Sequence, residues 1–309
     1  MEDQYKKDAE DIKNALDILG TDEDAIINIT SKRTLKERLK IIKLYKSMFG
    51  RDLISDLKAE LSGKLEDAII ASFTDLVEYD SICLKNAIAG IGTDEDALIE
   101  IIGSRPSWFL NKIKIKYKEM YNVDLESDVI GDTSGLFQKI LIALLQCSRK
   151  ENQEPNLEEC GNIAKDLFKI VDGKMEKDEM EYIKYLVIFS SNELTQIARL
   201  YHKLNNILLT DTIDKLFGSD ARTVIKTILY AHISPSEYFA FKIHKAVDGI
   251  ITDDNCLIRI IIGRSDIDMP AIKQYYKQLY NKDLIEDVKK NTSGDYKKLM
   301  VAMLSREIS

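Results

Sequence analysis

Apolar side chains recur every three or four residues along most of this chain. In its first part, Ile26 and Ile29 are followed by apolar residues at Leu35, Leu39, Ile42 and Tyr45. After the pair Ser62-Gly63 the same spacing returns, at Leu65, Ile69, Ile70 and Phe73. This spacing places side chains on one face of an α-helix, so the stripes predict helices that pack around a common core.

The pattern also repeats on a longer scale. Gly20-Thr21-Asp22-Glu23-Asp24-Ala25 recurs 72 positions later as Gly92-Thr93-Asp94-Glu95-Asp96-Ala97, and a weaker copy is Ile251-Thr252-Asp253-Asp254. Three landmarks follow each threonine at fixed distances: an arginine, an Asp-Leu-x-x-Asp motif and a Ser-Gly pair. The arginines are Arg33, Arg105 and Arg264, the motifs begin at Asp52, Asp124 and Asp283, and the pairs end at Gly63, Gly135 and Gly294. Such self-similarity indicates an array of structural repeats.

A decayed third copy lies between the second and the last. Lys177-Asp178-Glu179 and Gly218-Ser219 stand where the opening motif and the Ser-Gly pair are expected. The polar stretch 149–157, which contains Pro155, indicates a linker between two halves. The sequence therefore predicts an all-α fold of four repeats with about five short helices each, and the repeats cover residues 1–79, 80–150, 151–234 and 235–309.

Composition supports a helical fold and narrows the function. The 309 residues include only 4 Pro and 14 Gly, and the formal net charge is −8. A negative balance disfavours a nucleic-acid-binding protein and simple electrostatic docking on an anionic membrane. No apolar signal-peptide core, bilayer-length apolar run, Cys-x-x-Cys pair or enzyme motif is present, which favours a cytoplasmic protein that is not an enzyme.

The candidate chemistry surrounds the opening motif of each repeat. Thr21 and Thr93 are expected to cap helices, and Gly90 and Gly92 precede the second of these. Alternating glycines let the backbone turn its carbonyl groups outward. Calcium prefers six to eight oxygen ligands, including a carboxylate that binds through both oxygens. An acid stands forty positions after the glycine in two repeats, as Glu60 and Asp132.

On these motifs the chain resembles the annexin family. The resemblance covers about residues 3–306, and it is carried by Gly-x-Gly-Thr-Asp-Glu with its spaced acid, by Asp132-Thr133-Ser134-Gly135 and by Gly50-Arg51-Asp52-Leu53. It implies a curved all-helical disc with calcium loops on its convex face. It also implies that loop carbonyls and one carboxylate bind Ca²⁺, that acidic phospholipids complete the coordination shell, and that the protein is peripheral at membranes when calcium rises.

Carried over residue by residue, the resemblance gives four unequal sites. The main site is in repeat 2, with the carbonyls of Ile88, Gly90 and Gly92 and the carboxylate of Asp132. A weaker site is in repeat 1, where Ile18 replaces a glycine; its ligands are Leu16, Ile18, Gly20 and Glu60. Possible secondary ligands are Thr93, Glu95, Thr21 and Glu23. Repeats 3 and 4 lose the site, because Glu176 and Ile251 replace a glycine and Leu216 and Asn291 replace the acid.

Other features leave alternatives open. The basic loop residue common in annexins is absent, since Asp17, Ala89 and Asp248 take its place. The apolar loop tips Leu19, Ile91 and Ile250 could insert into a membrane interface or form local hydrophobic contacts. About ten residues precede the first helix pattern, so the family's regulatory head is expected to be nearly missing. The alternatives to calcium-dependent membrane binding are a structural or cytoskeletal protein that works through protein–protein assembly, and a metal-free helical scaffold.

Overall fold

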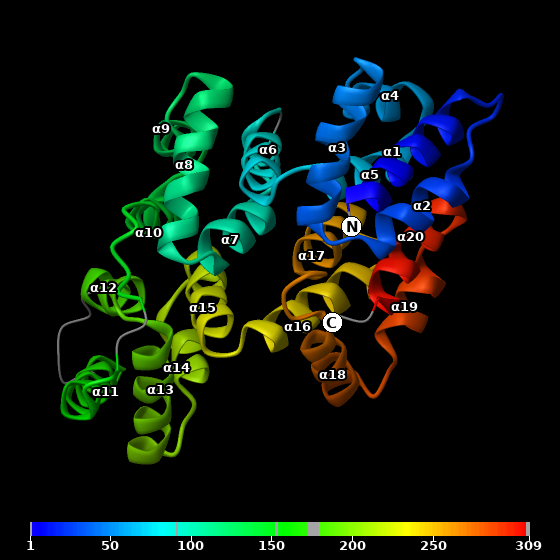
Figure 1. Ribbon diagram of the computed structural model, residues 1–309. Helices are drawn as coiled ribbons and strands as arrows, with labels where there is room; N and C mark the ends of the chain where they lie inside the picture. Colours follow the sequence, from blue (N-terminus) through cyan, green and yellow to red (C-terminus); the bar gives the residue numbers. More distant parts are fainter. Residues whose placement is uncertain (1, 91, 152–153, 172–178, 307–309) are drawn as a thin grey trace. The chain divides into compact units, whose positions relative to one another are not determined.

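The computed structural model describes residues 2–90, 92–151, 154–171 and 179–306, and every regular element in these ranges is an α-helix (Figure 1). Repeat 1 contains α1 (Glu2–Asp17), α2 (Glu23–Lys32), α3 (Leu35–Phe49), α4 (Leu53–Glu60) and α5 (Gly63–Phe73). Repeat 2 contains α6 (Leu76–Ile88), α7 (Glu95–Ser104), α8 (Ser107–Tyr121), α9 (Leu125–Asp132) and α10 (Gly135–Leu145).

The second half repeats this order. Repeat 3 contains α11 (Leu157–Val171), α12 (Glu179–Ile188), α13 (Ser191–Asn205), α14 (Leu209–Leu216) and α15 (Ser219–Ile233). Repeat 4 contains α16 (Pro235–Val247), α17 (Asp254–Arg264), α18 (Met269–Tyr280), α19 (Leu284–Asn291) and α20 (Gly294–Ser305). The predicted all-α fold with five helices in each repeat is confirmed for the described residues.

The third helix of each repeat ends in the same way. Its C-cap residue adopts the left-handed backbone conformation, which glycine and asparagine tolerate best. The four caps are Gly50 (φ 67°), Asn122 (φ 57°), Asn206 (φ 54°) and Asn281 (φ 53°). The chain reverses sharply at this cap, and the short fourth helix begins only a few residues later. The end of the fourth helix therefore lies at the same sequence distance from the cap in every repeat.

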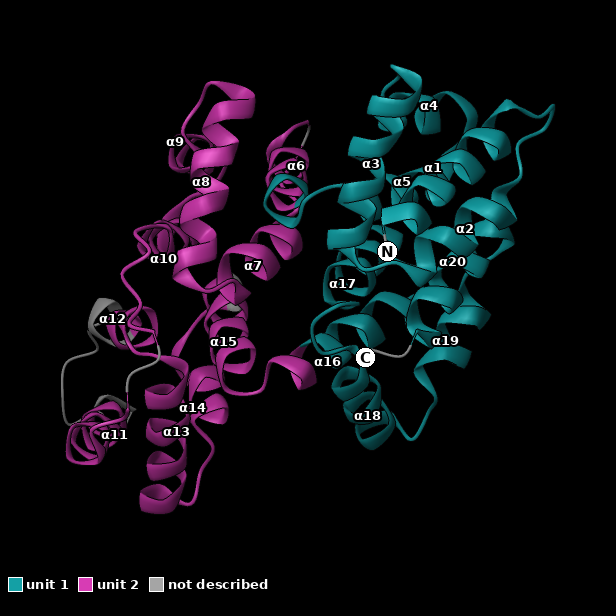
Figure 2. Ribbon diagram, in the orientation of Figure 1, with its two compact units in different colours: residues 1–79, 239–309 teal, residues 80–238 magenta. Residues whose placement is uncertain are grey.

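The helices form two compact units that do not follow the order of the repeats (Figure 2). Unit 1 comprises residues 1–79 and 239–309, which are repeat 1, the first turn of α6 and nearly all of repeat 4, and unit 2 comprises residues 80–238. In unit 1, α2 packs against α20 and α5 packs against α17. In unit 2, α7 packs against α15 and α11 against α13.

The polar stretch 149–157 is not a linker between two halves, because it lies inside unit 2. Arg149 is buried, and its guanidinium group donates hydrogen bonds to the carbonyls of Phe189 and Leu186. The amide of Lys150 donates to the carbonyl of Ile188 at 2.8 Å. These contacts attach the start of the stretch to repeat 3.

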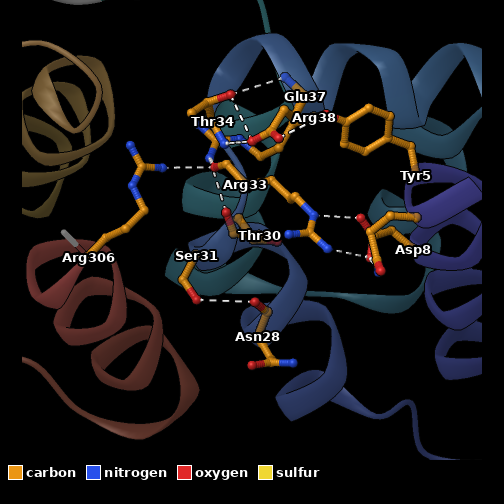
Figure 3. A network of polar contacts seen from close by, with 11 residues as sticks. Tyr5, Asp8, Asn28, Thr30, Ser31, Arg33, Thr34, Glu37, Arg38 and Arg306 are labelled. Atoms are coloured by element: carbon orange, nitrogen blue, oxygen red, sulfur yellow. Dashed lines mark hydrogen bonds and ion pairs between the residues drawn. The ribbon is translucent and has the colours of Figure 1, made fainter. Parts of the chain in front are cut away.

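An arginine at the end of each second helix in repeats 1, 2 and 4 has a defined partner. Arg33 binds both carboxylate oxygens of Asp8 at 2.6 and 3.0 Å, as Figure 3 shows, and Arg105 binds Asp80 at 2.7 and 3.1 Å. Each of these acids lies 25 residues before its arginine. In repeat 4 that position is Phe239, and the guanidinium carbon of Arg264 lies 4.5 Å from its ring centroid. A planar guanidinium can use either kind of partner to join the first and second helices.

Arg38 of α3 is buried in the centre of repeat 1 (Figure 3). Its guanidinium group donates to the carbonyls of Ser72 at 2.5 Å and Thr30 at 3.0 Å. Burial lowers the pKa of Arg38 to about 9. The buried cation is retained because it satisfies carbonyl groups at the ends of α2 and α5 that would otherwise lack partners.

Two further observations concern the described residues as a whole. No helix there is both long and apolar enough to cross a membrane. All four cysteines are free thiols, and two of them, Cys160 and Cys256, are buried.

Candidate metal centre

The loop between α6 and α7 has the open backbone that alternating glycines suggested. Gly90 has φ +113° and Gly92 has φ +90°, and no atom beyond the adjoining residues lies within 4 Å of the place where a Cβ would stand at either residue. Residues with side chains rarely adopt this region of backbone conformation. Ile91 lies outside the described residues, but both flanking glycines are exposed.

The base of this loop is fixed by hydrogen bonds. The amide of Asp94 donates to the carbonyl of Ala87 at 2.8 Å, and the Asp94 carboxylate accepts from the amide of Ala97 at 3.0 Å. Asp94 is therefore the N-cap of α7, and the expectation that Thr93 caps this helix is wrong by one residue. In repeat 1 the cap is likewise Asp22 and not Thr21. The loop extends one residue further than the sequence motif suggested, and this frees the threonine hydroxyl.

The freed hydroxyl connects the loop to the distant acid. Thr93 Oγ1 lies 2.6 Å from Oδ2 of Asp132 and 3.1 Å from its main-chain carbonyl oxygen. Asp132 is the last residue of α9 and is half-buried. The structure thus brings Asp132 beside the loop that carries Gly92, as the forty-residue spacing predicted.

A tyrosine–aspartate pair positions the helix that carries this acid. Tyr117 of α8 donates to Asp128 at 2.6 Å, and Lys85 donates to the same carboxylate at 2.9 Å. Burial favours the neutral acid, but these two donors hold the pKa of Asp128 below its usual value. The equivalent pairs are Tyr45–Asp56 at 2.7 Å and Tyr276–Asp287 at 2.8 Å. The Asp-Leu-x-x-Asp motif is thereby explained, although the tyrosine 11 positions before its second aspartate was missed in the sequence.

The predicted ligands of repeat 2 are all oxygen atoms. They are the carbonyl oxygens of Ile88, Gly90 and Gly92 and the carboxylate of Asp132, and hard cations such as calcium prefer oxygen ligands. No group of three or more His, Cys, Asp or Glu side chains that could hold a metal occurs in the described residues, so zinc-like side-chain sites have no candidate there. A single carboxylate leaves a divalent ion with positive charge to attract a further anionic ligand.

The loop of repeat 1 has the same parts in a different backbone conformation. Gly20 has φ +91° and Thr21 has φ +38°. The amide of Thr21 donates to the carbonyl of Ile18 at 3.3 Å, so one predicted ligand is already hydrogen-bonded inside the loop. Thr21 Oγ1 donates to Oε2 of Glu60 at 3.3 Å, which brings the predicted acid to the loop. The fourth predicted ligand, Leu16, has a buried side chain.

The loop of repeat 4 lacks the open backbone. Neither Gly249 nor Ile251 adopts a left-handed conformation, and a Cβ on Gly249 would lie 3.1 Å from the carbonyl oxygen of Ile251. The carbonyl of Thr252 accepts a hydrogen bond from the amide of Asp254 at 3.1 Å. Asn291 offers no carboxylate, and its amide nitrogen donates to the carbonyl of Asp287 at 2.9 Å.

Repeat 3 gives less information. Glu176 lies outside the described residues. Leu216 is the last residue of α14 and is half-buried, at the position that Asp132 occupies in repeat 2. A leucine side chain provides no oxygen ligand there.

The possible secondary ligands lie at helix starts. Glu23 and Glu95 are the first residues of α2 and α7, directly after the cap. Glu23 and Glu60 both line an open pocket of about 410 Å³ in unit 1, to which Asp254 also contributes. Burial raises the pKa of Asp254. The structure therefore brings Glu23 near the weaker predicted site of repeat 1.

Comparison with known proteins gives the same assignment as the site. A sequence model of the family described as Annexin matches residues 7–71, 79–144 and 238–303. Annexin A4 of Homo sapiens is 36% identical over 297 residues, which are 96% of this chain and 93% of that protein. Annexin A5 of Rattus norvegicus is 36% identical over 302 residues, covering 98% of this chain and 95% of that protein. The chain spans less of two other relatives, 44% of annexin A6 of Gallus gallus and 62% of annexin A7 of Homo sapiens.

Solved structures agree with the sequence relatives. The structure of annexin III superimposes with a TM-score of 0.94 at 30% identity, covering 98% of this chain and 94% of that one. A calcium-bound annexin (Sm)1 gives a TM-score of 0.88 at 27% identity and covers 99% of this chain and 91% of that one.

Four five-helix repeats, two of which hold a distant acid against the loop before their second helix, define a class of helical repeat proteins. Within this class the chain belongs to the annexin family. Members of the family are in general calcium-dependent phospholipid-binding proteins that associate peripherally with membranes, and they are not enzymes.

Proposed function

We propose that this chain binds acidic phospholipid membranes in a calcium-dependent manner, with repeat 2 as its principal site. The observation that carries the proposal is the hydrogen bond between Thr93 and Asp132, which holds the acid beside a loop with two left-handed glycines. The net charge of −8 adds support, because an acidic protein needs a bridging cation to approach an anionic surface.

Each residue of repeat 2 has a separate task in this mechanism. Calcium would be held by the carbonyls of Ile88, Gly90 and Gly92 and by both carboxylate oxygens of Asp132, and it would supply open coordination positions for a lipid phosphate or carboxylate. The glycines allow the loop to direct its carbonyl groups outward. Thr93 orients the Asp132 carboxylate before any ion arrives, which reduces the ordering that binding requires.

Repeat 1 would add a weaker site through Leu16, Ile18, Gly20 and Glu60. Its Ile18 carbonyl must first give up the hydrogen bond to Thr21, and Glu60 is more exposed than Asp132. Thr21 with Glu23, and Thr93 with Glu95, would serve as secondary ligands when lipid is present. The protein would then be cytoplasmic at low calcium and would move to membrane surfaces when calcium rises.

Co-sedimentation with phosphatidylserine vesicles tests this function. The wild type should pellet with vesicles in calcium and much less in chelator, and Asp132→Ala should need far more calcium. Asn291→Ala is the matched control, because it changes the equivalent residue of repeat 4. Equal calcium requirement in the wild type and Asp132→Ala would move the working site to repeat 1. A lack of pelleting at millimolar calcium would reject membrane binding and favour protein–protein assembly.

A further inference from the structure

The loop of repeat 4 carries two adjacent aliphatic side chains that are almost fully exposed. The exposed fraction is 107% for Ile250 and 87% for Ile251. Ile251 replaces the second glycine of the calcium loop, so this one replacement removes a part of the metal site and adds apolar surface. Exposed isoleucines at a loop tip give the folded unit no packing energy, which leaves room for a role in contacting a partner.

The neighbouring corner has also changed its charge. In repeat 2, Ile130 and Gly131 precede Asp132, whereas in repeat 4 two lysines, Lys289 and Lys290, precede the residue that replaces the acid. Both lysines are exposed at the end of α19. Lys289 lies 3.4 Å from Glu286, which is a loose surface ion pair of small energy.

The lysine corner is held against the isoleucine loop. Thr252 Oγ1 donates to the main-chain carbonyl of Asn291 at 3.1 Å, and Thr252 follows Ile251 while Asn291 follows Lys290. The two isoleucines and the two lysines therefore belong to one small surface. We call it the repeat 4 corner, and it consists of Ile250, Ile251, Lys289 and Lys290.

The acids near this corner are partly committed elsewhere. The Asp253 carboxylate accepts the amide of Cys256 at 3.0 Å as the N-cap of α17. Asp254 faces the pocket of unit 1, where Lys64 and Tyr296 also lie. Asp248 is exposed, with His244 Nε2 at 3.9 Å from its carboxylate. Glu286, at 3.4 Å from Lys289, is thus the acid that opposes the lysine pair at contact distance.

The chemistry of the corner matches an anionic lipid interface. Apolar side chains beside lysines are the combination that binds a bilayer surface, with the isoleucines in the acyl boundary and the ammonium groups at the headgroups.

We propose that the repeat 4 corner binds the surface of an anionic bilayer without calcium. The proposal rests on the proposed function for the class of partner, but it uses a different repeat and no metal. Each lysine near an anionic surface strengthens binding by about fivefold. The lysines thus take over part of the charge that calcium supplies in repeat 2, and the isoleucines add apolar insertion.

The test uses the full chain, chelator and low ionic strength, with vesicles of equal parts phosphatidylserine and phosphatidylcholine. Wild type should show weak partitioning that Asp132→Ala leaves unchanged. Lys289→Gln with Lys290→Gln should weaken it by about twentyfold, and Ile250→Ser with Ile251→Ser should weaken it by at least tenfold. The charge-matched control is Lys6→Gln with Lys7→Gln, two exposed residues in the first turns of α1 that should have no effect.

The outcomes separate this proposal from the proposed function. If wild type does not partition in chelator, or if the repeat 4 variants partition as well as wild type, the corner does not bind lipid. Equal binding to pure phosphatidylcholine vesicles would overturn the role of the lysines. None of these results bears on the calcium-dependent pelleting that Asp132→Ala tests, and loss of that pelleting leaves the chelator measurement intact.

Discussion

Repeats 2 and 4 build the same scaffold around loops of opposite chemistry. In both, an aspartate amide closes the loop on a carbonyl seven residues earlier, its carboxylate caps the next helix, and the preceding threonine hydroxyl contacts a residue 39 positions on. These contacts are Asp94 to Ala87 and Ala97 with Thr93 to Asp132, and Asp253 to Ala246 and Cys256 with Thr252 to Asn291. Of these two repeats, only repeat 2 has the left-handed glycines and the carboxylate.

The comparison shows that the scaffold does not depend on the metal site. Repeat 4 keeps every hydrogen bond that fixes the loop ends, although Ile251 and Asn291 have removed two parts of the calcium site. The glycines and the acid of repeat 2 are therefore not needed for these loop-end contacts, which agrees with the ligand role proposed for them. Exchanging these residues between the repeats should change binding without unfolding either unit.

The strongest way to break the comparison is to give repeat 2 the residues of repeat 4. Gly92→Ile with Asp132→Asn should weaken calcium-dependent vesicle binding by about a hundredfold or more, since a β-branched residue at φ +90° is strained and the carboxylate is lost. Calcium titration with vesicles measures the effect, and circular dichroism checks that the helices remain. Retained affinity in a folded variant would show that repeat 2 is not the principal site.

Low pH should distinguish the stability of the two units that contain these loops. His232 in unit 2 is buried with Nδ1 3.3 Å from Ser191 Oγ, and burial followed by the nearby Arg149 charge lowers its pKa to about 3. The unfolded chain binds this proton more tightly, so stability is full above pH 6.5 and is lost as the pH falls toward 3. At pH 5 the loss should be about 2 kcal/mol.

Urea unfolding at pH 7 and pH 5, followed through Trp108 in unit 2, measures this loss. His232→Gln removes the titrating group and should show a smaller difference between the two pH values. Trp108 is the one tryptophan of the sequence, so its fluorescence reports on unit 2. Identical pH dependence in wild type and variant would rule out His232 as the source.

The converse exchange sharpens the comparison. Ile251→Gly with Asn291→Asp should restore a calcium site in repeat 4 and raise the affinity for vesicles at limiting calcium by about tenfold. Isothermal titration with vesicles should find one additional calcium ion per chain. The single variant Asn291→Asp is the control, because it adds the acid without opening the loop. An unchanged number of bound ions would mean that further residues of repeat 4 block the site.

The smallest expected effect concerns the threonines. Thr93→Val should remove the hydrogen bond that orients Asp132 and weaken calcium binding by about fivefold, which corresponds to about 1 kcal/mol. Thr252→Val removes the matching bond to Asn291 and should lower thermal stability by a similar energy while calcium binding stays unchanged. A loss of calcium affinity in Thr252→Val would contradict the assignment of repeat 4 as metal-free.

The sequence was sufficient for the helices and for the residues that meet in repeat 2. Apolar spacing is a local property, so it predicts helices wherever they form. The spacing from Gly92 to Asp132 equals the spacing from Gly20 to Glu60, and this repetition correctly indicated that each acid lies beside its loop. In repeat 3, α14 and the start of α15 lie where the period requires, whereas Lys177 and Asp178 of the predicted opening motif lie outside the described residues.

Other features depend on three-dimensional contacts that spacing does not encode. The position of the helix cap at Asp94 follows from how far the loop extends, and the close approach of the Ile251 carbonyl oxygen to Gly249 follows from the path of the backbone. The grouping of repeats 1 and 4 into one unit depends on packing between helices far apart in the chain. The change from Ile130 and Gly131 to Lys289 and Lys290 is present in the sequence, but it becomes visible only when the repeats are aligned position by position.

Unit 1 is built from two segments that lie far apart in the sequence, and this affects how the chain folds while it is synthesised. Residues 80–238 form a unit from one continuous segment, which can fold on the ribosome as soon as it emerges. The first 79 residues must wait for residues 239–309, and at the usual rates of translation this delay is roughly 10 to 45 s. During that time the apolar faces of α2 and α5 that later meet α20 and α17 are uncovered. Nascent chains of this protein should therefore depend on chaperones mainly through their first repeat.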